Sequence, residues 1–419
     1  MTSKRLAAAL ALIAAGAIAV VLARDDEPPE FIRAPPIERV IQDDAIFLHD
    51  PASLGSTLDE IRELGFARLR VTADWSVLAP APAARDKPEF NAADPAAYDE
   101  LENPFWDNLD RAVVEASRRG IEVMVDIGFW APLWAAEPDA EGSIERPRTR
   151  IDAAEYADFA RAVVQRYGGE HIPPGGEALP RVSMFTLWNE PNIPGFFEPQ
   201  WERTGKGRRP ASPHLYRGMV DAAYPAIKEA RPDATVLVGA LAARGSYDEA
   251  ELSGGVPPLR FVRELACVDG RLEPLARDDC DRFRPVRGDG FSIHPYSFRT
   301  PPDAPGRRDN VPIGGLGRLI ELLKALAARD RIDPKLVDVY ITEFGYKTDP
   351  PDAEEGVSPE QQRDYWLRAE QIAASHPEVK MFAQFLVRDS VCEGCLFWPT
   401  GYRYGDGTPK PLMDALGSG

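Results

Sequence analysis

Histidine is scarce in this chain, with 5 among 419 residues, and the scattered histidines form no H-E-x-x-H or comparable pair. Because such pairs are the usual mark of a catalytic metal, we expect neither a metal nor another cofactor. Basic residues are also outnumbered: 49 lysines and arginines stand against 67 aspartates and glutamates, a net charge of −18. Nucleic-acid binding needs clustered basic side chains that release counterions, so we expect no nucleic-acid partner. A neutral or cationic partner is easier to accommodate.

One long apolar run lies at the N-terminus, where Lys4 and Arg5 precede 18 apolar or small residues, 6–23. This pattern is typical of an export signal, and residues 1–24 are interpreted as a signal peptide or a membrane anchor. Both readings stay open, because the run ends in a weak cleavage site and is close to the minimum length of a membrane helix. Residues 25–36 resemble a short extended linker. We therefore expect a secreted, extracellular protein, or one tethered to the outer face of the plasma membrane.

Cysteine is scarce as well, and its four residues form two couples. Cys267 and Cys280 lie in one polar connection, and Cys392 and Cys395 form a C-x-x-C. In an exported protein the favoured interpretation is a local disulfide within each couple. Two alternatives stay open: a zinc site made of all four cysteines, and a redox-active C-x-x-C.

From Ile37 onward, apolar strand-like runs alternate with amphipathic helical patterns. Such alternation predicts a parallel sheet covered by helices, and eight units close into a barrel. A doubly wound open sheet is the rival, but it usually carries a G-x-G-x-x-G turn after its first strand, and this chain has none there. We predict an α/β fold, a single (β/α)8 TIM barrel over residues 37–416. The predicted strands span 39–48, 67–72, 121–127, 182–190, 235–241, 290–296, 337–342 and 379–387.

Two glutamates stand at the ends of predicted strands. The fourth run leads into Asn189-Glu190-Pro191, and a residue before proline favours extended backbone, so Glu190 is expected to close its strand. Glu343 ends the seventh run. The active site of such barrels forms at the carboxyl ends of the strands. We therefore expect Glu190 and Glu343 to be catalytic and to face each other at about 5–5.5 Å, the separation that retaining glycosidases use.

Further polar and aromatic residues follow the predicted strands. Flat aromatic faces above a barrel suit the apolar faces of sugar rings. The candidate substrate-binding residues are Arg70, Trp75, Trp130, Asn189, His294, Tyr296 and Trp398. Simpler interpretations stay open, with the tryptophans packing loops, His294 bonded within the core, and the Arg70 charge pointing to a helix instead of into the barrel mouth. A buried arginine needs a partner, and the nearest plausible acid for Arg70 is Glu343.

These motifs resemble the clan A glycoside hydrolases, which include family 5 cellulases and family 39 glycosidases. The resemblance covers nearly all of residues 37–416. It rests on Asn189-Glu190 and Glu343, on Arg70 after the second strand, and on His294-Pro295-Tyr296 on the sixth. It implies that Glu190 is the acid/base, Glu343 the nucleophile and Tyr296 a support for the nucleophile. The chain departs from several of these families at the end of strand eight, where it has Gln384 to Asp389 instead of a tryptophan.

The resulting expectation is a retaining β-glycosidase that cleaves O-glycosidic bonds of a β-linked oligo- or polysaccharide by double displacement. Two alternatives stay open. One is a non-catalytic carbohydrate-binding barrel on the cell surface, and the other is a transglycosylase that uses the same residues. The sequence predicts neither the sugar, nor endo or exo action, nor the oligomeric state.

Overall fold

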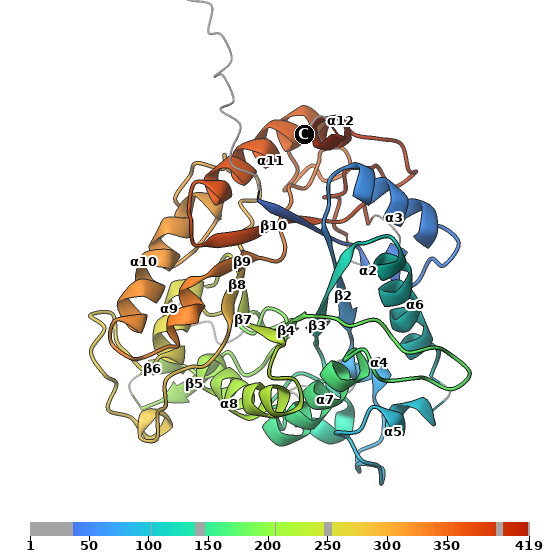
Figure 1. Cartoon of the computed structure of the whole chain (residues 1–419). Helices are drawn as coiled ribbons and strands as arrows, with labels where there is room; N and C mark the ends of the chain where they lie inside the picture. The colour runs from blue at the N-terminus through green and yellow to red at the C-terminus, as the bar shows by residue number, and fades with distance from the viewer. Residues whose placement is uncertain are drawn as a thin grey trace, which may run out of the picture. The chain divides into compact units, whose positions relative to one another are not determined.

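The computed structural model describes residues 37–101, 103–138, 147–205, 207–246, 254–390 and 397–417. Eight parallel strands close into a barrel in the order β1-β10-β9-β8-β7-β4-β3-β2 (Figure 1). The strands are β1 (Glu38–Gln42), β2 (Arg68–Ala73), β3 (Glu122–Ile127), β4 (Met184–Leu187), β7 (Thr235–Ala242), β8 (Gly290–His294), β9 (Val339–Ile341) and β10 (Val379–Phe385). The predicted (β/α)8 barrel is thereby confirmed.

Helices flank the barrel on the outside (Figure 1). The longer ones are α3 (Leu54–Glu63), α6 (Pro104–Arg118), α7 (Ala153–Arg166), α8 (Ser212–Ala230), α9 (Pro258–Leu265), α10 (Leu316–Ala327), α11 (Pro359–Ala374) and α12 (Pro411–Gly417). Short helices α2 (Asp44–Phe47), α4 (Trp75–Leu78) and α5 (Ala96–Asp99) lie in the loops, and strands β5 (Trp201–Thr204) and β6 (Gly207–Pro210) pair antiparallel after β4.

The helix starts follow from local hydrogen bonds. The Asn103 side chain accepts from the amide of Phe105 ahead of Pro104, as the sequence predicts for an N-cap with a first-turn proline. Asp152 accepts from two amides at the start of α7. A full capping box, in which side chain and backbone bond in both directions, is found at Ser358 and Gln361 on α11.

The first predicted strand was too long, because β1 ends at Gln42 and residues 44–47 are helical. Asp43 causes the break: its buried carboxylate accepts from the Ile46 amide and from the amides of Val387 and Arg388. Burial raises the pKa of Asp43 to about 6, against the effect of these three amides. Asp43 thus fixes both the chain after β1 and the chain after β10.

One cluster of apolar side chains is formed by residues of the barrel strands. This cluster consists of Val40, Met124, Met184, Leu237, Met381 and Ala383, with Tyr340 packed against it. A side chain at Gly290 would overlap the Tyr340 ring, so this strand position accepts only glycine without rearrangement. Glu190 and Glu343 follow the carboxyl ends of β4 and β9, where the active sites of such barrels form.

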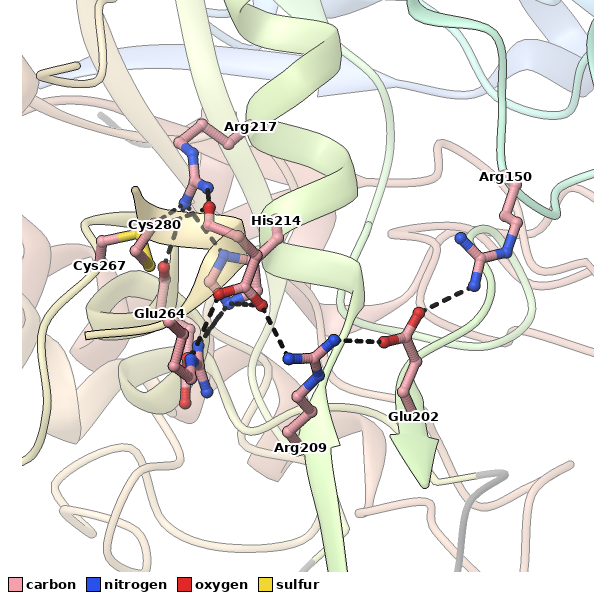
Figure 2. Close-up of polar contacts among 10 residues, drawn as sticks. Arg150, Glu202, Arg209, His214, Arg217, Glu264, Cys267 and Cys280 are labelled. Carbon is pink, nitrogen blue, oxygen red and sulfur yellow. Dashed lines mark hydrogen bonds and ion pairs between the residues drawn. A yellow bond between two sulfur atoms is a disulfide. The ribbon is translucent and has the colours of Figure 1, made fainter. Parts of the chain in front are cut away.

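Cys267 and Cys280 form a disulfide with a Cα–Cα distance of 5.7 Å, as predicted. Cys392 and Cys395 lie outside the described residues, so their pairing stays a prediction. Figure 2 shows the disulfide within a polar network. Arg217 of α8 donates to Cys267 Sγ at 3.2 Å, and Glu264 of α9 contacts both His214 and Arg277, at 3.2 and 2.5 Å.

The same network continues to the β5–β6 hairpin. Arg209 lies 3.7 Å from Asp279 and 3.1 Å from Glu202, and Glu202 in turn accepts from Arg150 at 2.8 Å (Figure 2). Alternating charges thus join the disulfide loop to the loops that follow β3 and β4. Several of these groups are partly exposed, so each ion pair contributes modestly to stability.

None of the helices within the described residues is long and apolar enough to cross a membrane. Residues 6–23, which carry the predicted export signal, lie outside the described ranges.

The segment before α12 is held by a buried ion pair. Lys410 Nζ donates to Asp389 at 2.7 Å and to Thr348 at 2.9 Å, and the side chains of the pair are 0% and 1% exposed. Burial raises the pKa of Asp389 although Lys410 opposes that shift, and burial lowers the pKa of Lys410 although Asp389 opposes it. The pair connects the chain after β9, the chain after β10 and the C-terminal segment.

We predict that Lys410→Met lowers the free energy of unfolding by about 3–5 kcal/mol, because Asp389 is left buried without a counter-charge. The pKa of Asp389 in the folded state then lies further above its unfolded value, so stability falls as pH rises through it. The loss should be larger at about pH 8 than at about pH 5 in urea titrations. The double variant Lys410→Met/Asp389→Leu is the control and should recover much of the loss; an equal loss at both pH values would contradict this account.

Candidate active site

The chain leaves β4 in an unusual backbone conformation. The strand ends at Leu187, and Trp188 and Glu190 have φ values of 67° and 42°. The prediction that Glu190 closes the strand in extended backbone is therefore wrong. The Glu190 amide donates to the carbonyl of Ala240 on β7 at 3.0 Å, and Asn192 bonds the backbone of Ala242, which together hold the turn. Non-glycine residues in this region are strained, and such strain is common at functional sites.

The turn brings Glu190 close to Glu343. One oxygen of each carboxylate and a ring nitrogen of His294 all lie within 4.8 Å of one another. His294 Nδ1 is 3.0 Å from Glu190 and 3.6 Å from Glu343, and its Nε2 is 3.0 Å from Thr342 Oγ1. The His294 side chain has no exposed surface, whereas 15% of the Glu190 side chain and 10% of the Glu343 side chain remain exposed. The two carboxylates can therefore be reached from the barrel mouth.

Glu343 is held on both of its oxygens. Arg70 donates to Oε1 at 2.6 Å, and the Tyr296 hydroxyl donates to Oε2 at 3.1 Å. Arg70 is completely buried and also donates to Gln42 and to Asn189 Oδ1, the latter at 3.3 Å. Since its Oδ1 is engaged by Arg70, the amide nitrogen of Asn189 points away from that contact.

The surroundings move the two pKa values in opposite directions. Burial raises the pKa of Glu190, and the charge of Glu343 adds to that shift while the hydrogen bond with His294 opposes it. Burial would also raise the pKa of Glu343, but the charges of His294 and Arg70 and the hydrogen bonds from Arg70 and Tyr296 outweigh it and lower the pKa. Two carboxyls with separated pKa values can act as an acid and an ionised carboxylate at the same pH.

Sequence reasoning missed a second acid beside Arg70. Asp126 on β3 has no exposed surface and lies 3.1 Å from Arg70 Nη2, while Thr186 donates to its other oxygen. Burial raises the pKa of Asp126 to about 6, although Arg70 and Thr186 oppose that shift. A signal was present, because an aspartate inside the apolar run of β3 needs a buried partner.

Two groups of side chains among the described residues are compact enough for a metal ion. One is Glu190, His294 and Glu343, and the other is His214 with Cys267 and Cys280. In the first, both oxygens of Glu343 already accept hydrogen bonds from Arg70 and Tyr296. In the second, the sulfurs are joined in a disulfide rather than present as thiolates. The donor sets therefore favour proton transfer in the first group and a structural role in the second.

The tryptophans differ in position. Trp75 has no exposed surface and stacks on Phe159 with ring centroids 5.5 Å apart, in contact also with Trp134 and Tyr156. No ring face is left for a sugar, so the assignment of Trp75 to substrate binding is corrected. Trp130 is half-buried, packs on Phe196 and donates to the Gly195 carbonyl at 3.0 Å, which joins the loops after β3 and β4. Its substrate-binding role stays a prediction.

Trp398 lies beside the two-carboxylate site. Its half-buried ring meets Tyr296 edge-to-face at 5.7 Å, and the Nζ of Lys347 lies 4.3 Å from the ring centroid. Trp398 belongs to the irregular segment beyond β10, and its substrate-binding role stays a prediction.

Comparisons with known proteins agree at the level of the fold. A family 39 glycoside hydrolase from Bacteroides cellulosilyticus WH2 superimposes with a TM-score of 0.57 at 20% identity over 91% of this chain. The β-glycosidase from Thermosphaera aggregans gives 0.55 at 16% identity, covering 92% of this chain and 96% of that one. A monomeric β-xylosidase from Caulobacter crescentus CB15 gives 0.53 at 16% identity, covering 92% of this chain and 69% of that one.

This chain covers 63% of the length of the Bacteroides hydrolase. No protein-family model and no curated protein matches it. The structure is thus similar to (β/α)8 glycosidases, family 39 among them, as the sequence motifs indicated. At these identities the likeness establishes the fold, and the chemistry must be argued from the site.

The positions of Trp75 and Trp398 predict different costs of truncation. Trp75→Ala should lower the free energy of unfolding by about 3–5 kcal/mol, because it empties a fully packed volume. Trp398→Ala, which removes a half-exposed ring, should cost about 2 kcal/mol or less. Urea titrations of both variants test this. A larger loss for Trp398 than for Trp75 would mean that their environments are misassigned.

Proposed function

We propose that this protein is a retaining β-glycosidase that hydrolyses O-glycosidic bonds of a β-linked oligo- or polysaccharide by double displacement. The observation that carries the proposal is the Glu190–Glu343 pair, with oxygens within 4.8 Å and pKa values shifted in opposite directions. Retaining enzymes hold their carboxyl groups about 5–5.5 Å apart, whereas inverting enzymes need about 6.5–9.5 Å to admit a water. Fold similarity to solved β-glycosidases adds support.

In the first step the ionised Glu343 attacks the anomeric carbon, and the bond to the leaving oxygen breaks. Protonated Glu190 gives its proton to that oxygen. The products are a glycosyl ester on Glu343, of inverted configuration, and the free alcohol of the leaving group. The lowered pKa of Glu343 and the raised pKa of Glu190 favour these starting forms.

Ester formation removes the negative charge of Glu343, which is one of the causes that raise the pKa of Glu190. The pKa of Glu190 then falls, so its carboxylate can act as a base. In the second step Glu190 takes a proton from a water that attacks the anomeric carbon, and the ester bond breaks. Glu343 is released as a carboxylate, and the second inversion restores the original configuration.

The neighbouring residues support these roles. Arg70 and Tyr296 orient Glu343 and stabilise its charge through their contacts at 2.6 and 3.1 Å. Asn189, whose Oδ1 accepts from Arg70, has its amide N–H groups available for a sugar hydroxyl. His294 bridges the two glutamates and, through Thr342, the end of β9. We assign Arg70, Tyr296 and His294 as positioning residues and Asn189 to the substrate.

Alanine substitutions of the two glutamates should lower activity in different ways. Glu343→Ala should lower kcat/KM by roughly 10⁴-fold or more for every substrate, because no glycosyl ester can form. Glu190→Ala should lose about 10²–10⁴-fold on substrates with sugar leaving groups but far less in the first step with an aryl leaving group. Azide should then restore turnover of Glu190→Ala and give the β-glycosyl azide, identified by NMR.

Three other outcomes would contradict these roles or favour one of the alternative functions. An α-azide from Glu190→Ala would mean that the roles are exchanged. Sugar binding by the wild-type protein without turnover of any aryl glycoside or β-glucan would favour a carbohydrate-binding barrel. Transfer of the glycosyl group to an added sugar in preference to water would favour a transglycosylase.

The pH dependence of kcat/KM should be bell-shaped. Activity falls at low pH as Glu343 is protonated and at high pH as Glu190 loses its proton. Tyr296→Phe removes a hydrogen bond that lowers the pKa of Glu343, so the acid limb should move to higher pH while the alkaline limb stays in place. An acid limb at the wild-type position would show that Tyr296 does not act on Glu343.

We also propose that the protein is exported, on the basis of Lys4, Arg5 and the apolar run 6–23. Its site would then act outside the cell, on a secreted or tethered enzyme. N-terminal sequencing of the exported protein distinguishes a cleaved signal peptide from a retained anchor, and accumulation in the cytosol would contradict export.

A further inference from the structure

A cavity of about 140 Å³ lies among the segments that follow β1, β2 and β3. None of its lining residues belongs to the two-carboxylate site. Its polar wall includes Asp44 of α2, Thr72 of β2 and Asp74 at the start of α4, and its apolar wall includes Phe105 of α6 and Phe129 after β3. Because the strands are parallel, it opens at the end of the barrel that also carries Glu190 and Glu343.

Two buried polar atoms in this wall lack a hydrogen bond of good geometry. Neither Asp44 Oδ1 nor Thr72 Oγ1 makes a well-formed hydrogen bond among the described residues, although Thr72 lies close enough to Asp44 to oppose the rise that burial causes in its pKa. Thr72 is only 5% exposed. A buried polar atom without a partner costs about 1–3 kcal/mol, which a ligand that supplies the missing bond can recover. One of these atoms is a carboxylate oxygen and the other a hydroxyl, so the pair matches a ligand that both donates and accepts, as sugar hydroxyls do.

The rest of the lining fits the same ligand class. Phe105 is 39% exposed and Phe129 is half-buried, and aromatic rings suit the apolar faces of sugars. The lining residues include two carboxylates, Asp44 and Asp74, and neither lysine nor arginine. Such a wall repels anionic sugars and favours neutral ones. The volume is below the roughly 300 Å³ of a whole ligand pocket, so it suits part of one sugar unit.

The cavity adjoins the groups that hold Glu343. Thr72 follows Arg70 by two residues on β2, so both side chains lie on the same face of the strand. A β-carbon placed on Gly128 would lie 3.5 Å from Thr72 and 3.3 Å from Asp126, the acid that pairs with Arg70. Burial raises the pKa of Asp44, and the adjacent Thr72 and the nearby charge of Arg70 oppose that shift. A sugar with its anomeric carbon at Glu343 can therefore extend a hydroxyl-bearing edge toward Asp44.

We propose that this cavity binds the hydroxyl-bearing edge of a neutral glycone, the sugar that Glu343 attacks, with Asp44 and Thr72 as its specificity-determining residues. The inference rests on the proposed function and adds the substrate class to it. Asp44 accepts a hydrogen bond from a sugar hydroxyl, and Thr72 bonds the same or the adjacent hydroxyl. Asp74 is committed to capping α4 through Ser76 and contributes its charge.

The experiment compares Asp44→Asn and Thr72→Val with the control Glu63→Gln, which removes one charge from the exposed face of α3. The probes are 4-nitrophenyl β-glycosides of neutral hexoses, their monodeoxy analogues and the glucuronide. Asp44→Asn should lower kcat/KM on the preferred neutral glycoside by roughly 10- to 100-fold. It should change kcat/KM little on the one deoxy analogue that lacks the bound hydroxyl, and the wild type should lose a similar factor on that analogue.

The same Asp44→Asn variant should improve the relative rate on the glucuronide, because one repelling charge is gone. Its effect should not depend on the aryl leaving group, because the cavity holds the glycone. Equal losses on all deoxy analogues, or kinetics that match Glu63→Gln, would overturn the proposal. Thr72→Val retains the shape of the side chain and serves as the second test should Asp44→Asn fold poorly.

Calorimetry with the neutral monosaccharides separates this proposal from the proposed function. If the wild type hydrolyses nothing but binds a monosaccharide, and Asp44→Asn weakens that binding roughly 10-fold or more, the glycosidase proposal fails and the cavity proposal stands. If the wild type is active and Asp44→Asn equals the control in both assays, only the cavity proposal fails.

Discussion

Arg70 has no exposed surface, and its charge must be balanced entirely by other side chains. Its partners come from around the barrel: Gln42 at the end of β1, Asp126 on β3, Asn189 after β4 and Glu343 after β9. A buried guanidinium without such partners would cost several kcal/mol. The geometry of the strand ends is therefore specified by one charge, and the proposed nucleophile is one of the groups that neutralise it.

This arrangement also explains why two nearby carboxyls are not equivalent. Glu343 receives direct donors on both oxygens, whereas Glu190 has His294 as its near partner and otherwise faces burial and a negative neighbour. Burial acts on both groups, so the difference lies in the donors. The strained turn at Trp188 and Glu190 also helps to position the acid. The Glu190 amide donates to the Ala240 carbonyl on β7, and this contact fixes where the Glu190 carboxyl lies.

The barrel could be predicted from the sequence because most of its strands lie in largely apolar runs that alternate with helical patterns, a signal that can be read without knowing which segments are neighbours in space. Glu190, Glu343 and Arg70 could be identified as candidates because a charged side chain next to an apolar run needs either a partner or a functional role. The predictions that were wrong concern features that depend on residues distant in sequence. The left-handed backbone of Glu190 is held by β7, the early end of β1 depends on amides near residue 387, and the burial of Trp75 depends on Phe159. Asp126 was passed over because one acid among apolar neighbours gives no hint of which cation it meets.

Barrel closure has a consequence for how the protein is made. The first strand pairs with the last, and Arg39 on β1 bonds Glu370 of α11 and the Leu416 carbonyl. Arg70 precedes Glu343 by 273 positions. At about 5–20 residues per second, translation separates their synthesis by roughly 14–55 s. During that interval Arg70 has Asp126 but lacks its second acid, and β1 exposes an unpaired edge. The nascent chain is therefore open to aggregation until β10 leaves the ribosome and can pair with β1, and the two carboxylates can meet only after Glu343 has been made.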